Sequence, residues 1–331
     1  MKVTNIIKRT VGTIAVPLLS FIICSIICAA NGTWLFGAGE SSFIIFLRAT
    51  ATVALVTFAL HINLNSGRFD FSLGAIALLS SLISAKICND AGLPTVVMLL
   101  ISVVAGAFFG FLSGLLYVLL RLPAIIVSLG VTLLYEGLAH IITSGYNVSF
   151  VTNTELTSFP SVLSYLCVIV VALAAIIIIF DYTSFGYNHK SLMYGQKISV
   201  NTGIKEVKNC LISYTICGVL MGVVGFISAT NIGTVQISLN FGSIAVMFTA
   251  FFPMFVGGFI GRFSNDKLGY MLGAMTSAFV SLMYSVLNVD SSIQQIVTAL
   301  ILVLFVVYLS NEGLLKKIFS MPFGKLKKGR E

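Results

Sequence analysis

Charged side chains are scarce in this chain: Lys, Arg, Asp and Glu together make up 9% of its 331 residues. A water-soluble protein carries roughly 25% charged residues, so soluble globular, disordered and disulfide-scaffold classes are excluded. Hydrophobic residues make up 58%, and the mean hydropathy is +1.05. The hydrophobic residues form long unbroken runs, whereas the strands of a β-barrel show a weak alternation of apolar and polar residues. We therefore predict an all-α polytopic membrane protein.

Sequence motifs of soluble enzymes are also missing. The chain has three histidines and contains no HExxH motif, no GxSxG motif and no phosphate loop of the GxxxxGK type. Its six cysteines lie in or beside apolar runs without CxxC spacing, which is typical of packing residues and not of a redox or metal site. We expect no catalytic residue, no cofactor and no bound metal, so any ATP-driven step requires another subunit.

Apolar runs long enough to cross a membrane recur along the chain, because a bilayer core about 30 Å thick needs about 20 apolar residues per helix. Turn-forming residues such as Leu122-Pro123 separate the runs. Ten spans are predicted, at residues 11–30, 43–62, 71–88, 94–119, 124–143, 160–181, 209–229, 242–260, 268–287 and 292–310. We accordingly expect a cytoplasmic N-terminus over 1–10, a transmembrane domain over 11–310 and a basic cytoplasmic tail over 311–331.

The basic residues indicate the orientation, because Lys and Arg concentrate in cytoplasmic loops. With the N-terminus inside and ten spans, every Lys and Arg except Arg48 and Lys86 falls in an inner segment. The opposite orientation reverses this distribution, so both termini are predicted to be cytoplasmic. The net charge of +8 then reflects topology and a tail suited to membrane lipid headgroups, with no need of nucleic acid.

The first span has a second interpretation. Lys8-Arg9, a long apolar run and then Cys28-Ala29-Ala30 resemble a cleavable signal peptide. The run is longer than an ordinary signal core, which favours an uncleaved first helix.

Glycines recur at helical spacing in several spans. Gly106, Gly110 and Gly114 lie four residues apart, and hence on one face of the fourth span. Gly218 and Gly222 have the same spacing in the seventh span. Helices in lipid associate by close backbone approach, which small residues permit. These glycines therefore predict tightly packed helix pairs, either as static contacts or as sliding surfaces.

Glu136 is the one acidic residue deep inside a predicted span, about 18 Å along the fifth helix at about 1.5 Å per residue. A carboxylate near the bilayer centre costs on the order of 3 kcal/mol to insert, so it should face a cavity or a partner, or be protonated. His140 lies one turn further on the same face and is its expected partner. The pair would form a proton relay or would line a polar cavity; one acidic position in ten helices favours the cavity.

Two inner segments carry further candidates. Asp70 and Ser72 precede the third span and are residue types that cap helices at their N-termini. Residues 182–208 form the longest inner loop, with a short helix and then Gly203 placed as a left-handed helix stop. A compact basic loop of this kind is either a docking surface for a soluble partner or a solvated connector.

Five segments occur in a characteristic order between about residues 45 and 310. They read DFSLG at 70–74, PAIIVSLG at 123–130 followed by EGL at 136–138, TSFGY at 183–187, VGG at 256–258 and VDSSIQQIV at 289–297. In this order they resemble the DLSVG, PPFI-(A/V)-TLG…RGL, TRFGR, GG and VSSxxQQVV motifs of one family. That family comprises the permease subunits of ATP-binding-cassette (ABC) importers for ribose and other simple sugars, a superfamily shared with branched-chain amino acid permeases.

The resemblance implies a type II-like ABC importer permease bundle in a bacterial plasma (inner) membrane, forming the translocation pathway for a simple sugar or related small polar solute. It implies two cytoplasmic ABC ATPase subunits, an extracytoplasmic substrate-binding protein and a second permease subunit, in a homodimer or heterodimer. The residues expected to couple to the ATPase are Gly195, Gln196, Lys197, Thr202, Gly203, Ile204 and Lys205. The residues expected at the pathway or at a helix break beside it are Asp70, Ser72, Gly74, Glu136 and His140.

The chain departs from the family pattern in three places. Arg68 replaces a common Gly, Glu136 stands where Arg is frequent, and residues 195–205 lack the usual GxN…AAR pattern. The main alternative is a proton-coupled secondary transporter that uses Glu136 and His140, but we find no convincing symmetry between the halves of the chain. A membrane enzyme, a third alternative, would need a cluster of polar residues at one membrane face.

Overall fold

A computed structural model describes residues 3–310; the predicted basic tail, 311–331, lies outside the described residues, as do the first two residues. The chain divides into two units, the first ending at Leu287 and the second beginning at Asn288. Helix α12 (Ser291–Ser310) belongs to the second unit and is described by itself.

The first unit contains all the other helices and a short pair of strands. They are α1 (Val3–Ala30), α2 (Glu40–Asn65), α3 (Leu73–Ala91), α4 (Thr95–Leu120), α5 (Ala124–Thr143), β1 (Val148–Ser149), α6 (Val162–Asp181), α7 (Ser184–Asn201), α8 (Glu206–Ile232), β2 (Thr234–Val235), the 3-10 helix η1 (Gly242–Ile244), α9 (Ala245–Phe248), α10 (Phe251–Gly261) and α11 (Asp266–Val286). Within the described residues, nine spans are long and apolar enough to cross a membrane, and α12 adds a shorter apolar stretch, Ser291–Leu304. The prediction of an all-α polytopic membrane protein is confirmed.

The start of α12 is stabilised by its own polar contacts. Asp290 Oδ1 accepts a hydrogen bond from Ser292 N at 2.8 Å, and Gln294 Nε2 donates to Val289 O at 2.8 Å. The hydrogen bond from the Ser292 backbone lowers the pKa of the Asp290 carboxyl. Both contacts satisfy polar groups at a helix end, where intrahelical partners are missing.

The eighth predicted span, residues 242–260, is divided into η1, α9 and α10, with a break at Thr249-Ala250. Just before η1 the chain turns through Asn240 and Phe241, whose φ angles are +56° and +65°. Residues with a side chain rarely adopt this left-handed conformation, so the turn needs support from its surroundings. Apolar periodicity does not register such a break, because the residues on both sides of it are hydrophobic.

The predicted inner loop, 182–208, is mostly helical. Thr183 caps α7, since its Oγ1 accepts a hydrogen bond from Gly186 N at 3.3 Å. α7 is kinked at Gly195, where φ −172° and ψ 79° leave the helical region. After α7 the chain reverses at Gly203, whose φ is +93°. The segment is therefore a compact helical structure and not an extended connector.

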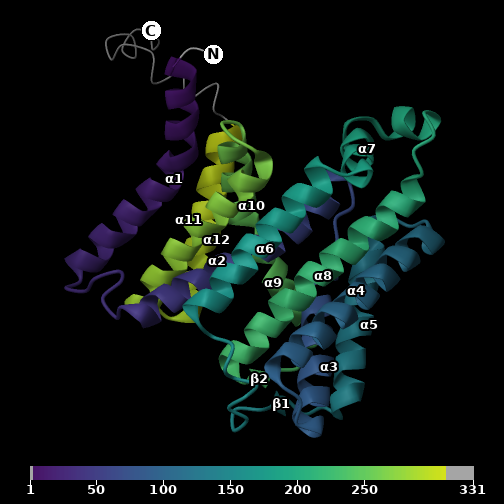
Figure 1. The fold of residues 1–331 in the computed structure, drawn as a ribbon, viewed down its shortest axis with the longest axis horizontal. Coiled ribbons are helices and arrows are strands. Elements are labelled where there is room, and N and C mark those ends of the chain that lie inside the picture. The colour runs from purple at the N-terminus through teal and green to yellow at the C-terminus, as the bar shows by residue number, and fades with distance from the viewer. Residues whose placement is uncertain (1–2, 311–331) are drawn as a thin grey trace, which may run out of the picture. The chain divides into compact units, whose positions relative to one another are not determined.

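The glycine faces of α4 and α8 pack directly against each other, and the two helices run side by side in Figure 1. A Cβ atom at Gly110 would lie 2.5 Å from Tyr214 O and 2.8 Å from Gly218 Cα. A Cβ atom at Gly106 would lie 2.9 Å from Gly222 Cα. The backbones are so close that no side chain fits between them, as van der Waals packing in lipid requires.

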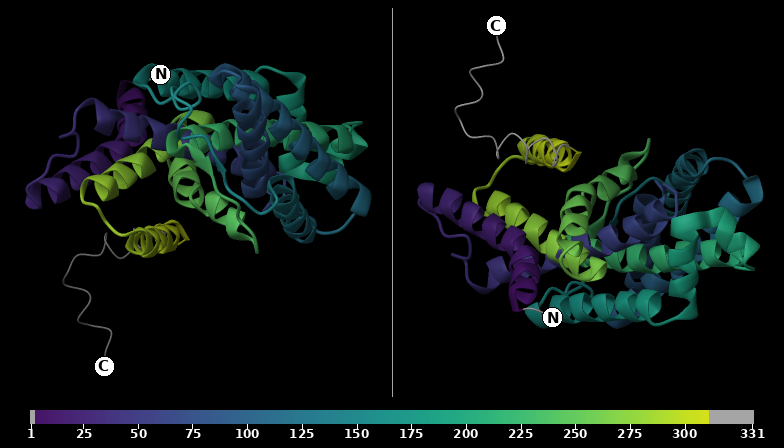
Figure 2. Two further views of the ribbon diagram at one scale, coloured as in Figure 1. Left: turned by 90° about the horizontal axis from the view of Figure 1, so that it is seen from below. Right: turned by 90° about the horizontal axis from the view of Figure 1, so that it is seen from above.

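Helix α1 lies at one edge of the first unit, beside α11, in both views of Figure 2. Ser20 Oγ donates to Thr276 O at 3.2 Å, and the rings of Phe21 and Phe279 are 5.4 Å apart. Most of α1 remains exposed, with 17% of its span buried. Its outer face is therefore the apolar surface that lipid would cover.

The strands β1 and β2 connect the two outer loops of the bundle. They pair antiparallel, with Val148 opposite Val235. Beside them, Asn147 Oδ1 accepts a hydrogen bond from Ile237 N at 3.0 Å. This ladder fixes the segment that leads from α8 into the turn before η1.

The close approach of α4 and α8 generates a stability prediction. We expect Gly218→Ala to lower the free energy of unfolding by about 1–3 kcal/mol, because the added methyl group collides with the α4 backbone. Thermal unfolding of the purified protein in detergent measures the effect. Gly130→Ala and Gly137→Ala are matched controls on α5, where a Cβ atom meets nothing within 4 Å. Equal unfolding temperatures for Gly218→Ala and the controls would refute the packing argument.

Candidate functional site

The α2–α3 turn, residues 66–72, is organised by a buried carboxylate. Asp70 has no exposed surface, and its Oδ1 accepts hydrogen bonds from Ser72 N at 2.9 Å and Ser72 Oγ at 2.6 Å. Its Oδ2 accepts one from Asn63 Nδ2 at 3.2 Å. Ser72 is the N-cap residue of α3, but its hydroxyl makes no capping bond and is donated to Asp70 instead. The expected cap is thus built around Asp70 and not by Ser72.

Polar contacts continue from this turn into the bundle. Ser72 Oγ lies 3.4 Å from Ser113 Oγ of α4, and Ser113 Oγ lies 3.0 Å from Tyr135 OH of α5. Tyr135 OH also donates to Phe109 O at 2.8 Å. Because all three side chains are buried, these mutual hydrogen bonds replace the water that lipid excludes.

Glu136 binds the backbone of a second turn, residues 238–243, which we name the re-entrant turn. Its Oε2 accepts from Phe241 N at 2.9 Å, and its Oε1 accepts from Ser243 N at 2.9 Å and from Ser243 Oγ at 2.6 Å. Glu136 is 1% exposed. The carboxylate therefore stands at the N-terminus of η1, where free N–H groups favour negative charge.

Gly74 brings α3 against the same turn. A Cβ atom at position 74 would collide with the carbonyl group of Ser243, so only glycine fits there. Gly74 and Glu136 are thus brought together at Ser243, a residue that the sequence pattern does not single out.

His140 does not join Glu136. It is exposed, and its ring lies against Gly145. Among the described residues no hydrogen bond joins Glu136 to His140, because both carboxylate oxygens are occupied by the re-entrant turn. The expected pair of Glu136 and His140 is therefore not formed, and the re-entrant turn takes the place of His140. Helical spacing placed the two residues one turn apart, but the unpaired backbone N–H groups of another segment supply the partners of the carboxylate.

An aromatic patch surrounds the break in the eighth span. Its rings come from the α2–α3 turn, α9 and α10, and neighbouring centroids lie between 4.6 and 6.4 Å apart. The patch consists of Phe69, Phe71, Phe248, Phe251 and Phe255. Edge and offset contacts of this kind stabilise aromatic clusters while leaving ring faces available.

The re-entrant turn and the break are exposed in the single chain. Asn240 and Thr249 are exposed, Phe241 is 38% exposed and Phe248 is 56% exposed. The turn lies within the thickness of the bundle, because it contacts Glu136 in the interior of α5. Irregular backbone at membrane depth occurs only where protein covers it or a water-filled cavity adjoins it. We therefore expect this face to be covered by protein or to adjoin water in the assembled transporter.

The candidate coupling residues lie on and after the second half of α7. The exposed ones are Gln196, Lys197, Thr202, Gly203 and Lys205, while Gly195 and Ile204 are partly buried. Gln196 Nε2 donates to Glu206 Oε1 at 2.5 Å, which ties the segment to the start of α8. Two large apolar side chains also protrude here: Tyr194 is 90% exposed and Ile198 is 73% exposed.

An ion cluster holds the first half of α7 to the bundle. Asp181 Oδ1 lies 2.7 Å from Lys190 Nζ and 2.6 Å from Lys267 Nζ. Asn265 Nδ2 donates to Asp181 Oδ2 at 3.2 Å. The hydrogen bond to Asp181 raises the pKa of Lys190. The cluster joins α6, α7 and α11 at the end that the distribution of basic residues places in the cytoplasm.

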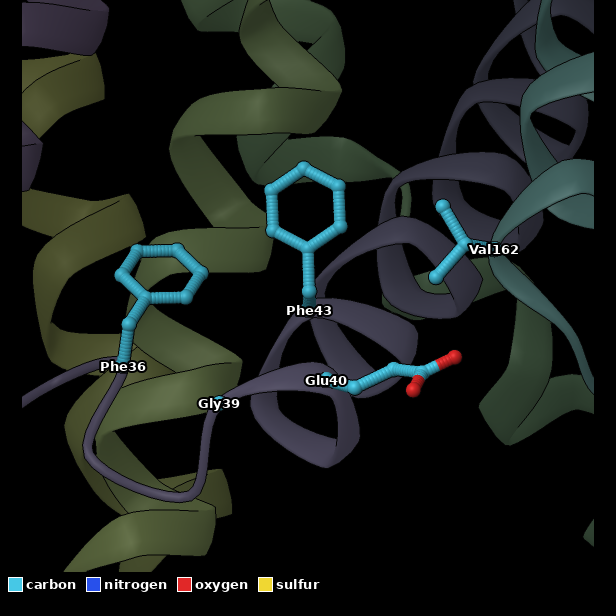
Figure 3. Close-up of a pocket in the computed structure, with 5 residues that line it drawn as sticks. All are labelled: Phe36, Gly39, Glu40, Phe43 and Val162. Carbon is cyan, nitrogen blue, oxygen red and sulfur yellow. The ribbon is translucent and has the colours of Figure 1, made fainter.

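The hollows in the described part of the chain include one at the start of α2 and one beneath α7. A shallow apolar hollow of about 410 Å³ lies at the start of α2 and α6 (Figure 3), where the Glu40 carboxylate points away from the rings of Phe36 and Phe43. The other, of about 130 Å³, lies beneath α7 and is lined by residues of α2, α6, α7 and α11. Residues 3–310 contain no group of three or more His, Cys, Asp or Glu side chains able to hold a metal ion.

The fold and this arrangement define a multi-pass membrane permease of the bacterial inner membrane. The chain belongs to the family described as branched-chain amino acid transport system / permease component, whose profile matches residues 42–309. It is therefore a transport permease subunit, and the family is one of transport components and not of enzymes.

Several curated relatives are sugar import permeases. The chain is 25% identical to the fructose import permease protein FruG of Bifidobacterium longum, over 69% of this chain and 71% of that protein. It is 26% identical to the autoinducer 2 import system permease protein LsrC of Photorhabdus luminescens, over 59% and 57%. It is 23% identical to the galactofuranose transporter permease protein YtfT of Escherichia coli, over 56% and 55%. The chain thus spans little more than half the length of the last two, and no solved structure matches it.

Sequence reasoning missed several residues that the structure brings to the site. Ser243 and Tyr135 are common residue types that lie outside the sequence motifs, and His189 of α7 also lies outside them. Their importance comes from contacts across the bundle, for which the chain offers no local signal. The left-handed turn at Asn240 was signalled only weakly, by an Asn followed by Phe-Gly.

The binding of Glu136 to the re-entrant turn makes Glu136→Gln a decisive variant. A glutamine presents an NH2 group to one of the backbone N–H groups, and a hydrogen bond to a charged group contributes about 1.5–3 kcal/mol. We expect lower thermal stability and loss of solute uptake at every pH between 5 and 8 by about 10-fold.

The matched control is His140→Gln, which changes an exposed side chain away from the turn. We expect it to retain uptake and its pH profile. A proton relay predicts the opposite pattern: Glu136→Gln would remove only the pH dependence, and His140→Gln would do the same.

Proposed function

We propose that this permease subunit forms the pathway of an ATP-driven importer for a simple sugar, together with separate ATPase subunits, an extracytoplasmic binding protein and a second permease subunit. The observation that carries the proposal is the exposed, kinked α7 segment at the inner end of a bundle of this family. It offers a surface for a cytoplasmic motor, while the chain has no phosphate loop of its own.

The exposed tip of α7 suits an obligate protein contact. Tyr194 and Ile198 protrude on either side of the Gly195 kink, and basic side chains at Lys197 and Lys205 flank them. An apolar centre with a charged rim is the usual anatomy of a protein interface. Closure of ATPase subunits on this tip would move α7 relative to the helices that it contacts.

The sugar pathway would run along the re-entrant turn and the aromatic patch. Exposed irregular backbone supplies N–H and C=O groups, and the polar side chains of Asn240 and Thr249 lie beside it. Aromatic faces and convergent polar groups are the usual lining of a site for a small polar ligand. A second permease subunit, identical or homologous, would close this face from the other side.

The relatives support a sugar as the substrate class, since their names include fructose and galactofuranose importers. The polar and aromatic residues of the proposed pathway suit a small polar solute and do not distinguish among the sugars. D-fructose and D-galactofuranose are accordingly the first probes, each supplied with its cognate candidate binding protein.

Reconstitution tests the proposal. We expect proteoliposomes that contain the chain, its ATPase subunits and its binding protein to accumulate labelled sugar only with ATP on the ATPase side. Tyr194→Asp should reduce uptake and co-purification of the ATPase by about 10-fold, because a charge is placed in the apolar centre of the contact. Tyr146→Asp is the matched control, because Tyr146 is also highly exposed, at 77%, and lies at the opposite end of the bundle. Accumulation by the chain alone, without nucleotide, would contradict the proposal.

Cysteine accessibility tests the pathway. In a cysteine-free background, we expect Phe248→Cys and Thr249→Cys to react with a membrane-impermeant maleimide, since water reaches a pathway but not lipid. Val171→Cys on α6 is the control, because it is 66% exposed on a regular apolar helix. Equal protection of all three positions would show that the aromatic patch faces lipid or is sealed by protein.

A further inference from the structure

Helix α7 has several buried side chains, and His189 is the one that makes polar contacts with both α8 and the α2–α3 turn. His189 is 3% exposed, and its ring packs against Phe180 and Phe185 at centroid distances of 5.2 and 5.8 Å. Its Nδ1 lies 3.1 Å from Asn209 Oδ1 and 3.3 Å from Ser213 Oγ, both on α8. The ring is thus fixed by packing on two sides and by polar contacts on a third.

The other ring nitrogen faces the α2–α3 turn. His189 Nε2 lies 3.3 Å from Ser66 Oγ, the first residue of that turn. Asn209 Nδ2 donates to Phe185 O at 3.3 Å, which leaves Asn209 Oδ1 to accept from His189 Nδ1–H. Nε2 then faces the hydroxyl of Ser66, which also donates to Ile62 O at 3.1 Å. Burial lowers the pKa of His189, and the nearby cations Arg68 and Lys267 lower it further.

The α2–α3 turn that His189 contacts leads directly to the candidate pathway. It carries Phe69 and Phe71 of the aromatic patch, and Asp70, which organises the start of α3. Ser128 Oγ of α5 lies 3.4 Å from Phe69 O. A displacement of Ser66 would therefore move residues that contact α3, α5 and α10.

The turn and the last turn of α2 before it also contain buried polar atoms without a partner. Arg68 is 4% exposed and its Nη1 makes no hydrogen bond, and neither does Asn63 Oδ1. An unsatisfied buried polar group costs about 1–3 kcal/mol. A rearrangement of the turn that gave these atoms partners would recover this cost.

Space beneath α7 permits movement. The 130 Å³ cavity is lined by His189, Lys190 and Met193 of α7, by residues of α2 and α6 around it, and by residues of α11. Next to His189, Lys190 holds α7 to α6 through Asp181. The cavity leaves room for the side chains on the inner face of α7 to shift when α7 is displaced.

We propose that His189 is the positioning residue that transmits movement of α7 to the α2–α3 turn, through Ser66, and thereby to the aromatic patch. The inference rests on the proposed function, in which ATPase subunits move α7. The inference gives His189 the role of a mechanical connection, although His189 binds neither the ATPase subunits nor the solute.

Hydrogen exchange in the complete complex tests the inference. The chain is assembled with its ATPase subunits in lipid nanodiscs, and exchange is compared without nucleotide and with ATP plus vanadate. In the unaltered complex we expect nucleotide to change exchange in peptides from α7 and from residues 62–74. In His189→Phe we expect the α7 change to persist and the 62–74 change to fall about 5-fold or more. Phenylalanine keeps the ring packing and removes the polar contacts.

Two further variants separate transmission from stability. His61→Phe is the matched control, since His61 lies nearby on α2 but contacts Asn65 and Tyr270, which are not on α7. We expect it to respond to nucleotide like the unaltered complex. Ser66→Ala removes the other end of the contact and should reproduce His189→Phe, and the double variant should be no worse than His189→Phe alone.

The outcomes are distinct. A normal 62–74 response in His189→Phe overturns the inference. If His189→Phe fails to assemble, Ser66→Ala decides: a full response in that variant overturns the inference, and a response confined to α7 supports it. If the unaltered complex binds no ATPase subunit or ignores nucleotide, the proposed function itself fails.

Discussion

The structure depends on the requirement that backbone N–H and C=O groups in a membrane find partners within the protein. Regular helices meet it by themselves, but the re-entrant turn cannot. There the Glu136 carboxylate accepts hydrogen bonds from Phe241 N and Ser243 N, and Gly74 allows α3 to lie against the Ser243 carbonyl. A charge that is costly in lipid is thereby stabilised by the groups that most need an acceptor.

Close backbone contact is the second constraint on the bundle. α4 and α8 meet through facing glycines, and α10 and α11 repeat the arrangement, with a Cβ atom at Gly273 lying 2.8 Å from Gly257 N. These contacts supply dispersion attraction where hydrophobic association is weak. They leave the re-entrant turn, α9 and the aromatic patch free of helix packing on one face, which is where a pathway can form.

The inner end of the bundle has a different character. Its contacts are polar and specific: an ion cluster at Asp181, and the imidazole of His189 between α7, α8 and the α2–α3 turn. A cavity lies beneath α7, whereas the glycine-packed helices are in direct backbone contact. In our proposal, the α2–α3 turn connects a moving α7 to this tightly packed interior.

The sequence by itself determined the class of structure, because composition and the length of apolar runs decide what can cross a bilayer, and its ordered motifs indicated the family. It also pointed to Glu136 as a carboxylate inside an apolar span, to Asp70 as a helix-capping residue, and to Gly74 as part of a motif that resembles the family. Only the tertiary structure decided their partners: Glu136 binds Ser243 and not His140. Helical spacing reports which residues share a face, whereas the break before α10 and the contacts of His189 arise between segments far apart in the chain.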